Sequence, residues 1–127
     1  MIDTASLQHW LNGYVEAWRS NDPRQIRSLF SEDARYAWSP FDEEPARGRD
    51  AIVEAWLNEP DDPDTWECSY EPLAIAGDLG VARGWTRYRR VGSKPAREYA
   101  NVFVMRFDAA GLCSEFTEWY MERPAIG

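Results

Sequence analysis

This chain of 127 residues has one histidine, two cysteines, a net negative charge and no long apolar run. No apolar run approaches the roughly 20 residues that a membrane-spanning helix needs, so no membrane partner is expected. The net charge of −8 argues against a nucleic-acid partner, because phosphate binding rests on clustered Lys and Arg. No set of His, Cys and carboxylates has metal-ligand spacing, and no Gly-rich turn joins a strand to a helix. We therefore expect neither a metal nor another cofactor.

The two cysteines and the first residues indicate where the protein works. Cys68 and Cys113 are isolated, with no C-x-x-C motif around either. The opening "MIDTASLQHW" is polar and acidic, unlike a secretory signal. Lone thiols without a signal are typical of a reducing compartment, so we expect a cytoplasmic location.

Large aromatic residues are the abundant component. Seven Trp, six Tyr and five Phe predict an interior built from rings, several of which carry a polar group that needs a partner. The length fits one domain, and no linker or repeat divides it, so residues 1–127 are predicted to form a single unit.

Helical periodicity marks the first part of the chain. Apolar residues recur at helical spacing from Leu7 to Trp18, and Asp22 with Pro23 predicts the start of a second, shorter helix. Residues 34–38 alternate like a short strand, 39–48 form an acidic, proline-containing loop, and a third helix is expected over 49–57.

From Thr65 the period becomes two, which predicts strands. We expect four of them, over 65–76, 80–91, 97–107 and 112–122, joined by short glycine-containing turns that favour antiparallel pairing. The chain is therefore predicted to be an α+β protein, with three N-terminal helices packed on a curved, mainly antiparallel sheet. Such a sheet leaves a conical interior, which is either filled or open.

This order of elements resembles the nuclear transport factor 2-like superfamily, and within it the SnoaL-like proteins. The resemblance rests on "YVEAWRSNDPRQIRSLFSEDARY", "RGRDAI" and "VFVMRFDAAGLCSEFTEWY" and covers nearly the whole chain. It implies the cone-shaped fold. It does not imply one reaction, because these folds host isomerases, cyclases, hydrolases and proteins without catalysis.

The resemblance allows the catalytic positions of particular family members to be compared with the residues of this sequence. Tyr14 falls at the place of the ketosteroid isomerase tyrosine, but the places of the two carboxylates hold Trp38 or Ser39 and Phe103, so that mechanism is rejected. Glu118 falls at the place of one carboxylate of the limonene epoxide hydrolase-like members, whose second carboxylate is missing here. The one histidine, His9, lies opposite Tyr14 on its helix and is expected to be exposed.

Glu118 is the leading site residue, because alternation in the last strand puts it between two aromatic rings. A buried carboxylate needs a partner, and Arg83 is predicted to supply it, with Tyr14 completing a candidate catalytic set. The pair is either a structural brace or the polar end of a ligand pocket. The other residues expected to form pocket wall or core are Trp18, Trp38, Trp56, Trp85, Arg87, Asn101, Phe103, Met105, Phe116 and Tyr120.

Two functions remain open from the sequence. One is a protein that binds a mostly apolar small molecule in its cone, with acid–base chemistry of the isomerase, cyclase or hydrolase kind. The other is a non-catalytic adaptor with a filled cone. In either case an apolar strip on the outer sheet face predicts a homodimer, since contiguous exposed apolar patches mark contact surfaces. The strip consists of Val102, Val104, Thr117, Trp119 and Met121.

Overall fold

Helices and strands follow the predicted order in the computed structural model, which describes residues 2–124. The helices are α1 (Thr4–Ser20), α2 (Pro23–Arg27) and α3 (Arg49–Asn58), with a 3₁₀ turn at Pro63–Thr65. The strands are β1 (Phe30–Ala37), β2 (Ala46–Arg47), β3 (Trp66–Ala76), β4 (Leu79–Tyr88), β5 (Arg97–Phe107) and β6 (Cys113–Glu122).

Local capping explains where the first two helices begin and end. The Asp3 side chain accepts a hydrogen bond from the Ser6 backbone at the start of α1. Asn21 ends α1 in a left-handed conformation, and Asp22 then caps α2 ahead of Pro23. A side-chain acceptor at each helix start satisfies backbone N–H groups that have no helical partner.

The six strands form one curved sheet in the order β2-β1-β6-β5-β4-β3. Neighbouring strands are antiparallel except β1 and β6, which run parallel, so the sheet is mixed. The α+β class is confirmed, but only α1 and α2 precede the sheet, because β1 and β2 come before α3 in the chain. The predicted short strand at 34–38 is part of the longer β1, and the predicted loop at 39–48 contains β2.

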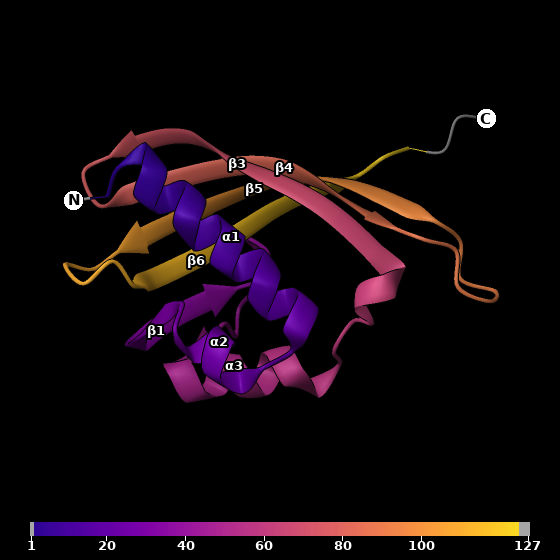
Figure 1. Cartoon of the computed structure of the whole chain (residues 1–127), viewed down its shortest axis with the longest axis horizontal. Helices are drawn as coiled ribbons and strands as arrows, with labels where there is room; N and C mark the ends of the chain where they lie inside the picture. Colours follow the sequence, from indigo (N-terminus) through magenta and orange to yellow (C-terminus); the bar gives the residue numbers. More distant parts are fainter. Residues whose placement is uncertain (1, 125–127) are drawn as a thin grey trace.

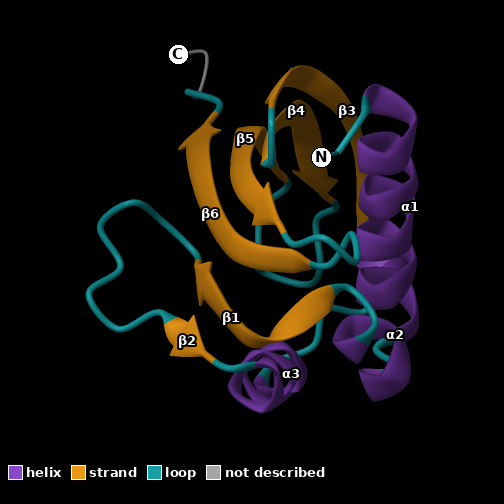
Figure 2. Ribbon diagram, turned by 90° about the vertical axis from the view of Figure 1, so that its left-hand side faces the viewer, coloured by secondary structure: helices purple, strands orange, loops and turns teal. Residues whose placement is uncertain are grey.

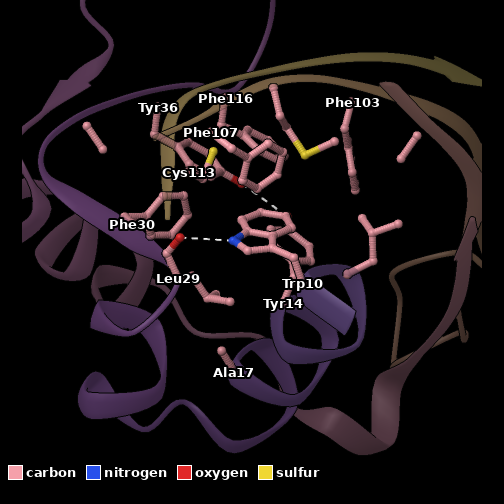
Figure 3. Packing of buried hydrophobic residues seen from close by; sticks show 14 of the residues in the cluster. Trp10, Tyr14, Ala17, Leu29, Phe30, Tyr36, Phe103, Phe107, Cys113 and Phe116 are labelled. Atoms are coloured by element: carbon pink, nitrogen blue, oxygen red, sulfur yellow. Dashed lines mark hydrogen bonds between the residues drawn. The ribbon is translucent and has the colours of Figure 1, made fainter. Parts of the chain in front are cut away.

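Helix α1 lies across the concave face of the sheet, and α3 packs beneath β1 (Figures 1 and 2). Trp10 of α1 helps to fill the narrow end of this curve. The Trp10 ring contacts Phe30 and Phe107 edge-on, with centroids 5.9 and 5.6 Å away. Its indole N–H donates to the Leu29 carbonyl at 2.9 Å (Figure 3), which ties α1 to the turn between α2 and β1.

The inner face of β4 carries glycine at the two points where other elements approach it closely. A side chain at Gly80 would press on Leu7 of α1 and on Phe107, and one at Gly84 would collide with the Ser69 backbone and the Tyr70 ring. Glycine at these points lets the sheet bend tightly around α1. None of the helices in the described residues is long and apolar enough to cross a membrane.

Candidate functional site

A cavity of about 640 Å³ lies in the wide part of the cone, where the core no longer fills the space. All the long elements contribute to its lining. The lining residues are Tyr14, Trp18, Tyr36, Trp38, Ser39, Asp42, Ala55, Trp56, Asp61, Tyr70, Thr86, Tyr88, Arg97, Tyr99, Asn101, Glu118 and Tyr120. Buried Phe103, Met105 and Phe116 lie outside this lining and belong to the core of the narrow end.

Glu118 reaches the cavity from β6, where its neighbour Phe116 is fully buried. Its one side-chain partner among the described residues is Asn101 of β5, whose amide nitrogen donates to Glu118 Oε2 at 2.6 Å. The second carboxylate oxygen has no hydrogen-bond partner in the described chain. Burial raises the pKa of the Glu118 carboxyl to about 7, and the Asn101 hydrogen bond opposes this rise.

Three further groups form a chain of hydrogen bonds that ends at Glu118. The Thr86 hydroxyl donates to Asn101 Oδ1 at 2.8 Å, and the Tyr70 hydroxyl lies 2.6 Å from the Thr86 oxygen. Because Thr86 has one hydroxyl proton and gives it to Asn101, Tyr70 must be the donor in its bond with Thr86. Each hydrogen bond in this series is therefore donated in the direction of the Glu118 carboxylate. The orientation of the Asn101 amide is fixed by its two hydrogen bonds.

A second polar group in the lining is a pair of tyrosines. The hydroxyls of Tyr14 and Tyr36 lie 3.0 Å apart, and both rings stack on Phe116, with centroid distances of 5.6 and 4.4 Å. Burial raises the pKa of both hydroxyls well above the ordinary value, and the negative charge of Glu118 raises both further. In such a pair one hydroxyl donates to the other, which leaves one proton free for a ligand oxygen.

Arg83 is the main correction to the expected site. It lies on the outer face of β4, where it pairs with Glu71 of β3 at 3.1 Å, so the predicted ion pair with Glu118 is wrong. Trp85 and Arg87 share that outer face, and the Arg87 guanidinium lies 4.2 Å from the centre of the Trp85 ring. The inner face of β4 instead carries Ala82, Thr86 and Tyr88, together with the two glycines.

The error came from assigning the alternation of β4 to the wrong faces. Period two separates a strand into two faces but does not say which is buried. A signal was present in the sequence: Glu71 faces Arg83, and Arg87 pairs with Glu98, as expected for a solvated face. The same period, applied with the correct face of β4, would have found Thr86 and Tyr88. Sequence reasoning also missed four lining residues on other strands, which are Tyr36, Tyr70, Arg97 and Tyr99.

The other sequence-predicted residues divide between pocket, core and outer surface. Glu118, Tyr14, Trp18, Trp38, Trp56, Asn101 and Tyr120 all line the cavity. His9 is exposed, as expected. In the part of the chain that the structure covers, no group of three or more His, Cys, Asp and Glu side chains is arranged to hold a metal ion.

Comparison with known proteins gives the family. A family model described as a SnoaL-like domain matches residues 11–116. The chain belongs to this SnoaL-like family. No curated protein matches it.

Solved structures show that the fold of this SnoaL-like domain recurs at low sequence identity. An NTF-2 like protein of unknown function from Burkholderia xenovorans is 18% identical, with a TM-score of 0.72 over 97% of this chain and 88% of that one. A ketosteroid isomerase-like protein from Erwinia carotovora atroseptica is 18% identical, with a TM-score of 0.64 over 95% and 97%. TsrD from Streptomyces laurentii is 20% identical, with a TM-score of 0.68 over 94% and 91%. The nuclear transport factor 2-like fold is thus shown, and no more is taken from these likenesses.

The raised pKa of Glu118 predicts how stability depends on pH in this SnoaL-like domain. Between the ordinary value of 4.5 and about 7 the folded chain holds more protons than the unfolded chain, so stability falls as pH rises. Glu118→Gln removes this loss. Urea unfolding from pH 5 to pH 8 should show the variant gaining up to about 3 kcal/mol relative to wild type.

A matched control lies on the same strand. Glu115 faces the outer side and pairs with Arg106, so Glu115→Gln should leave the pH dependence of stability close to that of wild type. Parallel pH profiles for wild type and Glu118→Gln would show that the carboxyl is not held at a raised pKa.

The hydrogen bond from Asn101 predicts a second effect on the same carboxyl. Because this bond stabilises the ionised form, Asn101→Leu should raise the Glu118 pKa above about 7. The carboxyl carbon shift of Glu118, followed by NMR against pH, reports the midpoint directly. A lower or unchanged midpoint would contradict the assigned role of Asn101.

Proposed function

We propose that this protein binds a small, mostly apolar molecule in its cavity and that Glu118 exchanges a proton with that molecule in an isomerase-type reaction. The observation that carries the proposal is the largely buried carboxyl of Glu118, with a pKa of about 7, facing an aromatic cavity of about 640 Å³. Pockets of this size suit drug-sized molecules. A carboxyl with a pKa near the working pH serves both as base and as acid.

The polar groups of the cavity support a proton transfer next to a carbonyl, in which the base is Glu118 of β6 and not the carboxylate that ketosteroid isomerases carry at the place of Trp38 or Ser39. The free oxygen of the Glu118 carboxylate takes a proton from a carbon beside the carbonyl, and the electron pair of that C–H bond moves to the carbonyl oxygen as an enolate. The free hydroxyl proton of the Tyr14–Tyr36 pair stabilises this oxygen by hydrogen bonding. When a carbon–carbon double bond adjoins the deprotonated carbon, the enolate is a dienolate, and Glu118 returns the proton to the far carbon of that double bond. The double bond moves next to the carbonyl, which completes an isomerisation without net gain or loss of atoms.

The placement of charges favours this reaction over the hydrolase alternative. A water-activating set with an arginine between two carboxylates needs a cation beside Glu118, and Arg83 lies on the opposite face of the sheet. Asn101 instead fixes one carboxylate oxygen and leaves the other for the ligand. The cavity also favours ligand binding over an adaptor whose cone is filled.

A probe reaction tests whether Glu118 acts as a base in the cavity. 5-Nitrobenzisoxazole is a planar aromatic molecule that opens to a coloured phenolate when a base removes its one acidic C–H proton. The wild-type rate should saturate with probe and rise with pH through a midpoint of about 7, because only the carboxylate form is a base. Glu118→Gln should lower the rate by about 100-fold or more.

Glu115→Gln, on the solvated face of β6, is the control and should keep the wild-type rate. A Glu118→Gln variant as active as wild type, or a rate without a midpoint between pH 6 and 8, would refute the role of Glu118 as the base.

We also propose that two copies associate through the outer sheet face. Val102 faces Trp119 across β5 and β6, and Val104 faces Thr117, so these side chains and Met121 form a continuous apolar strip. Trp119 is 44% exposed and Met121 is 72% exposed in the single chain. Burial of such a strip between copies is favourable by roughly 25 cal/mol per Å² of apolar area removed from water.

Light scattering coupled to size-exclusion chromatography tests this association. Trp119→Glu should convert a dimer to a monomer, because it places a charge at the centre of the apolar strip. Leu73→Glu is the control, since Leu73 is similarly exposed, at 50%, but lies on the edge strand β3. A wild-type monomer, or a dimer that survives Trp119→Glu, would contradict the proposal.

A further inference from the structure

The rings that line the cavity are all tyrosine or tryptophan, whereas the narrow end of the core is built mainly from phenylalanine, together with Trp10. The lining contains six tyrosines and three tryptophans but no phenylalanine, whereas Phe30, Phe103, Phe107 and Phe116 are buried in the narrow end of the cone. Tyrosine and tryptophan present electron-rich ring faces, and tryptophan is the strongest aromatic partner for a cation. The cavity is therefore walled by the ring types that attract positive charge.

The charged groups of the lining are mostly negative. Glu118, Asp42 and Asp61 are carboxylates, and Arg97 is the one cation among the residues that line the cavity. Asp42 accepts backbone N–H groups of its own loop, and Asp61 accepts the indole N–H of Trp18. Neither forms an ion pair in the described chain, so the lining carries uncompensated negative charge.

Arg97 does not neutralise the interior. It is exposed on β5, with its guanidinium 4.9 Å from the centre of the Tyr88 ring and 5.8 Å from that of Tyr99, and it donates to the Tyr99 hydroxyl. The contact shows that these ring faces hold a cation where the chain supplies one. No other Lys or Arg of the described residues lines the cavity. In residues 2–124 Glu118 forms no ion pair with Lys or Arg, and its side-chain partner is the neutral amide of Asn101.

We propose that the ligand carries a positively charged nitrogen, a protonated amine or a quaternary ammonium, held between the Glu118 carboxylate and the surrounding tyrosine and tryptophan ring faces. This inference rests on the proposed function, because it gives the chemical class of the molecule that occupies the same cavity. A ligand cation beside Glu118 forms the ion pair that no Lys or Arg of the described residues makes with it, and this cation favours the carboxylate form of Glu118. Rings and carboxylate act together, because a desolvated cation is attracted by both.

Two molecules of the same shape test the inference. 3-Hydroxyphenyltrimethylammonium and 3-tert-butylphenol differ in one central atom, nitrogen against carbon, and therefore in charge. Isothermal titration calorimetry of the full chain at pH 7.5 should show the ammonium compound binding about tenfold more tightly or better. Glu118→Gln should abolish most of this preference while leaving the affinity for the neutral phenol within about twofold.

The control separates the cavity from the general negative charge of the protein, which is −8. Glu115→Gln removes one carboxylate from the outer face of the same strand and should leave the preference unchanged. A preference that Glu118→Gln and Glu115→Gln reduce equally would be a long-range charge effect and would overturn the inference.

The remaining outcomes distinguish this inference from the proposed function. If the neutral phenol binds as well as the ammonium compound, the cavity still takes small aromatic molecules, but the cationic ligand is refuted. If neither compound binds at millimolar concentration, the proposed small-molecule function fails together with the inference.

Discussion

The packing of helix α1 into the concave face of the sheet is the constraint on which the other features of this structure depend. The sheet bends around α1 because the inner face of β4 is made small by Gly80 and Gly84, so that Leu7 and the Tyr70 ring can approach the backbone. Trp10 completes the closure of the narrow end by donating to the Leu29 carbonyl (Figure 3). The core is therefore close-packed at the narrow end of the cone, as protein interiors generally are.

The wide end stays unfilled for the same reason. A helix that fits tightly against one part of a curved sheet diverges from the rest, and side chains of Tyr14 and Trp18 on the later turns of α1 line a cavity instead of a core. The rings there are tyrosine and tryptophan, whose polar groups find partners in Tyr36 and Asp61. The fold therefore places hydrogen-bonding aromatic groups around space that a ligand can enter.

Glu118 takes its chemical character from this arrangement. Its strand neighbour Phe116 is buried under the two tyrosine rings, so the carboxyl lies at the boundary between core and cavity, where burial raises its pKa to about 7. An ion pair would lower that pKa, and its place is taken by the neutral amide of Asn101, which is oriented by Thr86. A carboxyl with one fixed and one free oxygen is suited to proton transfer, and its missing counter-charge is suited to a cationic ligand.

The sequence by itself determined the order of elements and the four long strands to within a few residues, and it placed Glu118 on the same strand face as Phe116 and Tyr120, because capping residues, turn glycines and period-two alternation are local signals. It also carried the family resemblance, which the SnoaL-like match confirms. The partner of Glu118 was decided only by tertiary structure. Alternation in β4 is equally compatible with Arg83 inside or outside, and the choice follows from which face can lie against α1 and Tyr70 without a clash. The cavity likewise depends on sheet curvature, which sums small backbone bends over several strands. Gly80 and Gly84 allow this curvature, but they do not by themselves show how much space it leaves.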